Sequence, residues 1–110
     1  MKNQYSLKSN IEFGKILSKG KNFANKYLII NYIDAKDFKL GISVPKKLGN
    51  AVFRNYHKRV VKDIIPKLDV YNINKHIVII VRQSFTKLPI SEKYNVLKNM
   101  FNKIINGKQK

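Results

Sequence analysis

Cysteine and tryptophan are absent from the 110 residues, and acidic residues number only six. Without cysteine, the chain cannot form disulfides, thiolate zinc sites or iron–sulfur ligation, and it has no cysteine nucleophile. The longest uninterrupted apolar run, residues 77–81, is far shorter than the roughly 20 residues that span a bilayer. Residues 1–10 are polar and lack the apolar stretch of a secretory signal. We therefore expect a cytoplasmic protein that makes no contact with a membrane.

Positive charge is what the chain has in excess. Lysine and arginine together number 23, which gives a formal net charge of +17. A folded domain with this charge repels itself, so we expect the charge to be retained for a polyanionic partner. Hydrophobic residues make up 44% of the chain, enough for one compact core. The prediction is one domain over residues 1–110, with short flexible tails at both ends.

Hydrophobic periodicity and turn residues predict an α+β sandwich, with a sheet of about four strands packed against three helices. Its element order is α-β-β-β-α-β-α. The second and third strands are expected to form a hairpin, because a short polar turn separates them. The expected elements are a helix at 10–19, strands at 21–24, 27–33 and 39–44, a helix at 51–65, a strand at 77–82 and a helix at 91–106.

Local signals mark the ends of these helices. Ser9 and Glu12 fit a capping box before the first helix, and Gly20 is a suitable C-terminal stop. Asn50 is a suitable N-cap for the middle helix, and Pro66 ends it.

The middle helix separates apolar from basic residues on a helical wheel. We expect Val52, Phe53, Tyr56, Val60 and Ile64 to share the core side. The opposite side holds Arg54, Asn55, Lys58, Arg59 and Lys62, a stripe without an acidic residue. Like charges four residues apart repel, and a merely solvated face normally mixes signs. A solvated face in a lysine-rich chain is the plainer alternative. Two of the three arginines and the preceding Lys46 and Lys47 favour phosphate binding.

Single-stranded RNA suits a helix-backed sheet with available aromatic rings better than duplex DNA does. The chain has no helix-turn-helix, zinc-finger or basic-zipper pattern.

The loop and the middle helix read Gly41-Ile42-Ser43-Val44-Pro45-Lys46-Lys47-Leu48-Gly49-Asn50-Ala51-Val52-Phe53-Arg54-Asn55-Tyr56-His57-Lys58-Arg59. This run resembles the signature of the bacterial ribonuclease P protein subunit. That family typically reads G-(hydrophobic)-S-V-S-K-K-(hydrophobic)-G-N-A-V-x-R-N-R-x-K-R, with another arginine three residues later. The resemblance extends over nearly the whole chain. Three positions depart from the pattern: Pro45 replaces a serine, and Tyr56 and Lys62 replace arginines.

The resemblance implies a function and a set of site residues. The protein would bind a large catalytic RNA and the 5′ leader of precursor tRNA, while the RNA with its Mg²⁺ ions hydrolyses the bond that releases the mature 5′ end. A left-handed β-α-β crossover is implied as well. The implied contacts to the catalytic RNA are Lys46, Lys47, Asn50, Arg54, Asn55, Lys58, Arg59 and Lys62. The implied leader cleft holds Phe13, Leu17 and Asn31, the last two at positions that are aromatic in the family.

No residue of the chain is predicted to be catalytic or to bind a metal. His57 and His76 lack a second ligand at suitable spacing, and the carboxylates are scattered. Arg82 either pairs with a carboxylate or faces RNA, and Gly49 is expected to supply a positive φ. Two other classes stay open: a small ribosomal-type structural RNA-binding protein and an independent RNA-cleaving enzyme.

Overall fold

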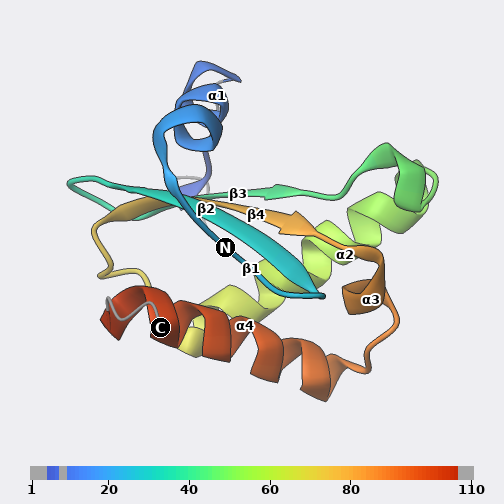
Figure 1. Ribbon diagram of the computed structural model, residues 1–110. Helices are drawn as coiled ribbons and strands as arrows, with labels where there is room; N and C mark the ends of the chain where they lie inside the picture. The colour runs from blue at the N-terminus through green and yellow to red at the C-terminus, as the bar shows by residue number, and fades with distance from the viewer. Residues whose placement is uncertain (1–4, 8–9, 107–110) are drawn as a thin grey trace.

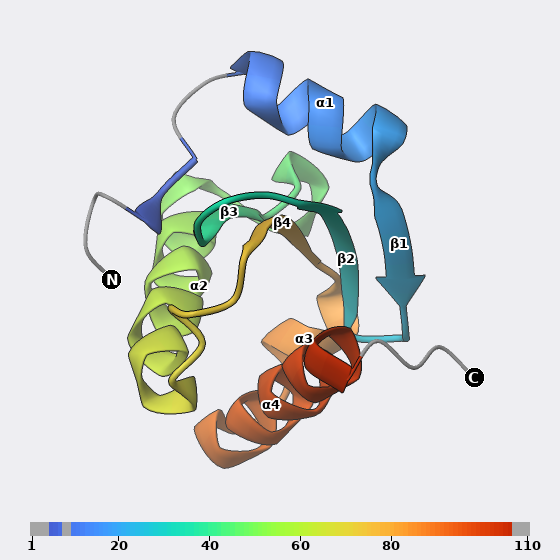
Figure 2. The same ribbon diagram turned by 90° about the vertical axis from the view of Figure 1, so that its left-hand side faces the viewer.

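A computed structural model describes residues 5–7 and 10–106 and shows three layers (Figure 1). Helix α1 (Asn10–Lys19) lies on one face of the sheet. Helices α2 (Ala51–Ile64) and α4 (Ile90–Asn106) lie on the other face. Figure 2 shows the same layers after a quarter turn, with the strands between α1 and the pair formed by α2 and α4.

The predicted α+β class and element order are confirmed. The strands are β1 (Lys21–Ala24), β2 (Leu28–Asp34), β3 (Lys39–Ser43) and β4 (Lys75–Val81). The sequence did not predict three short helical pieces, which are η2 (Lys46–Leu48), η3 (Ile65–Leu68) and α3 (Gln83–Thr86). None of the described helices is long and apolar enough to cross a membrane.

The expected hairpin between the second and third strands is wrong. The strand order is β1-β2-β4-β3, so β4 lies between the two strands that are consecutive in the sequence. Strand β4 pairs antiparallel with β2 and parallel with β3, and the hairpin is the one between β1 and β2. The central place suits β4 because it is apolar on both faces: Ile77, Ile79 and Val81 on one, Val78 and Ile80 on the other.

Two apolar layers hold the structure together, one on each face of the sheet. The larger layer lies under α2 and α4 and includes Ile30 and Ile79 of the sheet with Leu97 and Phe101 of α4. The smaller layer lies under α1 and consists of Leu7, Ile16 and Val78, with Phe13, Ile33 and Ile80 packed against it. The sheet therefore presents a second face that α1 covers only in part.

The wheel of the middle helix predicted Val60 and Ile64 correctly but placed two other residues wrongly. Val52 is 78% exposed and Tyr56 is 49% exposed. The buried residues of α2 are instead His57, Val60, Val61 and Ile64. The start of α2 extends past the ends of β3 and β4 (Figure 1), so the first turn of this helix reaches beyond the sheet. The buried side is therefore centred on His57 and Val61.

Helix ends follow the predicted signals where the structure describes them. The Asn50 side chain accepts a hydrogen bond from the Phe53 backbone N–H at 2.9 Å, as an N-cap does. The Gly20 N–H donates to the Ile16 carbonyl at 2.8 Å and ends α1. The predicted cap Ser9 lies outside the described residues. The α-helical part of α2 ends at Ile64, just before Pro66 as predicted, and η3 follows it as a 3₁₀ turn.

Candidate nucleic-acid interface

The loop before α2 fixes how the helix begins. Gly49 has a φ of 166°, which is extended backbone, so the predicted positive φ is wrong. Glycine is needed here for a different reason, since a Cβ at this position would lie 2.5 Å from the ring of Phe53. The Gly49 carbonyl also accepts a hydrogen bond from Nε of Arg54 at 3.2 Å. The first arginine of the basic stripe is thereby held against the loop.

The eight predicted contacts to the catalytic RNA lie along this loop and α2. Six of them are exposed, namely Lys46, Lys47, Asn50, Asn55, Arg59 and Lys62. Arg54 and Lys58 are half-buried. The ion pairs in the described part of the chain involve Lys75 with Asp34 and His76 with Asp37, so no carboxylate neutralises these cations. The surface is therefore a stretch of unpaired positive charge beside the sheet.

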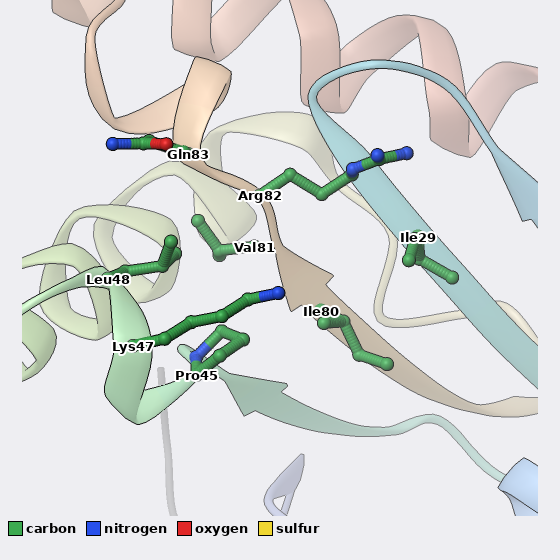
Figure 3. A pocket seen from close by; sticks show the side chains of 8 residues that line it. All are labelled: Ile29, Pro45, Lys47, Leu48, Ile80, Val81, Arg82 and Gln83. Atoms are coloured by element: carbon green, nitrogen blue, oxygen red, sulfur yellow. The ribbon is translucent and has the colours of Figure 1, made fainter.

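The face of the sheet that carries α1 opens into a groove near the same loop. On this face Ile29 of β2 lies opposite Ile80 of β4, and Ile80 lies beside Ser43 of β3. The groove has a volume of about 530 Å³. Its lining consists of Ile29, Pro45, Lys47, Leu48, Ile80, Val81, Arg82 and Gln83 (Figure 3). The two isoleucines form an apolar floor, and Lys47 and Arg82 supply positive charge.

Arg82 has no carboxylate partner among the described residues. Its Nη1 donates to the carbonyl of Asn25 at 3.1 Å, and its side chain extends from the end of β4 toward β2 (Figure 3). The alternative in which Arg82 pairs with a carboxylate finds no support among the described residues. Sequence reasoning had missed the groove itself, because Ile29 and Ile80 meet only through strand pairing.

The predicted leader residues lie on this same face but are not equally accessible. The ring of Phe13 lies against Gly41, where a Cβ would be 2.3 Å from the ring. Asn31 is in the sheet and only 7% exposed, whereas Leu17 is 48% exposed. Tyr32 points into the core on the opposite face, because neighbouring residues of a strand alternate between the two faces of the sheet. The open groove lies two residues along β2 from Asn31, at the pair Ile29 and Ile80.

Carboxylates and histidines do not gather in the described part of the chain. No group of three or more that could hold a metal ion is found there. Asp34 accepts from Nζ of Lys75 at 2.6 Å, and this hydrogen bond lowers the pKa of Asp34. Asp37 lies 2.8 Å from Nε2 of His76, which lowers the pKa of Asp37. These pairs are surface interactions near the turn between β2 and β3.

A family model described as Ribonuclease P matches residues 1–105. The chain belongs to the ribonuclease P protein family. Similar proteins include the ribonuclease P protein component of Mycoplasmopsis synoviae, which is 51% identical over 85 residues that cover 77% of this chain and 76% of that protein. The component of Mycoplasma mobile is 39% identical over 110 residues, covering 100% and 98% of the two chains.

Solved ribonuclease P proteins share the fold. The Staphylococcus aureus protein has a TM-score of 0.77 at 34% identity, covering 89% of this chain and 93% of that one. The Thermotoga maritima protein has a TM-score of 0.78 at 27% identity, covering 86% and 93%. Membership in this family makes the chain a component of a tRNA-processing endoribonuclease and implies an RNA partner.

Proposed function

We propose that the protein binds the catalytic RNA of ribonuclease P through the cations of η2 and α2, and holds the 5′ leader of precursor tRNA on the α1 face of the sheet. It would work in the cytoplasm. The RNA and its Mg²⁺ ions carry out the hydrolysis. The protein supplies affinity, discrimination of precursor from mature tRNA, and relief of repulsion between phosphates.

The observation that carries this proposal is that one loop serves both surfaces. Lys47 lines the groove over Ile29 and Ile80 and also belongs to the basic loop that leads into α2. An apolar floor suits the faces of unstacked bases, and cations at the rim suit the phosphates that join them. A single strand in the groove would thus pass directly from the leader site to the surface for catalytic RNA.

Two features of the chain support a chemical role for the RNA rather than for the polypeptide. The described carboxylates do not form the clusters that a two-metal nuclease needs. Asp34 and Asp37 are instead engaged by Lys75 and His76. The proposal therefore assigns no catalytic residue to the protein.

The test is reconstitution with the cognate catalytic RNA at low Mg²⁺, with precursor and mature tRNA as ligands. We expect the protein to tighten binding of precursor tRNA more than of mature tRNA. Changing Lys47→Ala and Arg82→Ala together should reduce that difference, while Lys36→Ala, an exposed lysine of the turn between β2 and β3, should not. Cleavage by the protein without RNA, or equal effects on both tRNAs, would contradict the proposal.

A further inference from the structure

A buried lysine lies among aromatic rings where α2 meets α4, away from the groove. Lys93 is only 4% exposed. Its ammonium lies 6.0 Å from the ring centroid of Tyr56 and 5.8 Å from that of Phe85. The ring of Tyr56 in turn meets the ring of His57 edge-on at 5.0 Å. Rings from α2 and α3 therefore flank one cation that α4 carries.

This cation has no counter-charge in the described part of the chain. Neither of the ion pairs found there involves Lys93. The neighbouring His57 is 3% exposed, and its Nδ1 has no hydrogen-bond partner. Lysine is almost never buried unless it is paired, because removing its charge from water costs free energy. A methionine would fill the same space without that cost, so packing alone does not account for the lysine.

Tyr56 connects this cluster to the surface. Its side chain is 49% exposed, although the ammonium of Lys93 lies over one face of its ring. Arg59 follows one helical turn later on the exposed side of α2. Tyr56 also occupies the position where the family signature has an arginine. Lys93 brings a positive charge from α4 to the ring that stands at this position.

We propose that the junction of α2 and α4 binds one nucleotide of the catalytic RNA, with an unpaired base stacked on Tyr56 and its phosphate beside Lys93. The inference rests on the proposed function, since it takes the RNA partner from there. An aromatic ring with an adjacent cation matches the two parts of a nucleotide, a flat base and an anionic phosphate. The phosphate would supply the counter-charge that Lys93 lacks in the protein.

The first experiment uses the absence of tryptophan from the chain. Tyr56→Trp places a single tryptophan at the site, and stacking of a base should quench its fluorescence when the catalytic RNA is added. Tyr71→Trp, in the loop between η3 and β4, is the matched control and should keep its fluorescence. Quenching of Tyr56→Trp by precursor tRNA alone, rather than by the catalytic RNA, would overturn the assignment of the partner.

The second experiment separates binding from stability. Lys93→Met should raise the melting temperature or leave it unchanged, because it removes an unpaired buried charge. The same change should weaken binding of the catalytic RNA by at least about fivefold. It should also make the slope of log affinity against log salt concentration shallower by about 0.7–0.9. Tyr56→Ala should weaken binding similarly, while Val52→Ala, one turn earlier and exposed, should not.

The outcomes distinguish this inference from the function on which it rests. If the wild-type protein binds the catalytic RNA and Lys93→Met binds it equally well, the nucleotide site is wrong and the proposed function stands. If Lys93→Met unfolds the protein, the lysine has a structural role and the inference is overturned. If the wild-type protein fails to bind the RNA, the proposed function itself is wrong.

Discussion

The Nε–H of Arg54 donates a hydrogen bond to the carbonyl of Gly49, 3.2 Å away. This contact joins the first turn of α2 to the loop that carries Lys46 and Lys47. It engages only one nitrogen of the guanidinium, so the two terminal nitrogens stay available for a phosphate. Arginine at this position therefore both orders the loop and presents a donor pair.

Arg54→Lys should weaken binding of the catalytic RNA although the charge is kept. A lysine ammonium cannot hold the Gly49 carbonyl and present a planar pair of donors to phosphate. We expect a loss of about tenfold, equivalent to about 1.4 kcal/mol. Lys58→Arg, one turn further along α2, is the control for altered side-chain size and should bind at least as well. Equal affinity of Arg54→Lys and the wild-type protein, measured by filter binding, would contradict the role of the contact.

Two valines of α2 test which side of the helix is buried. Val60 is 8% exposed and Val52 is 78% exposed. Val60→Asp buries an unpaired charge, which costs several kcal/mol and takes up much of a typical stability of about 5–15 kcal/mol. We expect Val60→Asp to unfold or strongly destabilise the domain and Val52→Asp to melt like the wild-type protein. Similar melting curves for both variants, followed by circular dichroism, would mean that the helix is rotated.

The loop lysines should appear in the salt dependence of RNA binding. Each phosphate contact to a single strand contributes a slope of about −0.7 to the log–log plot of affinity against salt. Changing Lys46→Ala and Lys47→Ala together should flatten the slope by roughly 1 to 1.5. The control changes the exposed Lys36 and Lys67 to alanine, which removes the same charge elsewhere. If both double variants alter the slope equally, only the net charge matters.

Acid should destabilise the protein through His57. Burial, and to a smaller extent the nearby Lys93 ammonium, lower the pKa of His57 below its usual 6.5. Below about pH 6.5, the folded chain then binds fewer protons than the unfolded chain. The free energy of unfolding is therefore highest above this pH and falls as the pH drops below it. Urea unfolding at about pH 7.5 and about pH 5 should show a larger loss for the wild-type protein than for His57→Gln. Parallel losses in the two proteins would exclude His57 as the cause.

Leader recognition should improve when an aromatic ring is placed on α1. Leu17 is half-exposed, so Leu17→Phe adds a ring without repacking the core. Stacking of one base contributes about 1–3 kcal/mol. We expect tighter binding of precursor tRNA but unchanged binding of mature tRNA by the reconstituted complex. Ile11→Phe, at an 83% exposed position of the same helix, is the control. A gain for both tRNAs would show that Leu17 lies outside the leader site.

Interactions between residues close in the chain made part of the structure predictable. The bounds of α1, the Asn50 cap and the start of α2 followed from hydrogen bonds that span three or four residues. The basic stripe of α2 and the lysines before it were read from the same local spacing. The order of those residues was also enough to identify the family.

Tertiary structure alone decided how the elements meet. The place of β4 between β2 and β3, the exposure of Val52, and the cover over Asn31 depend on contacts between segments far apart in the chain. A helical wheel gives the spacing of apolar residues but not which neighbour covers them, so it could not choose His57 over Tyr56 for the buried side. The contact between Lys93 and Tyr56 exists only because α4 packs against α2, and burial and electrostatic contacts of this kind are set by the whole fold.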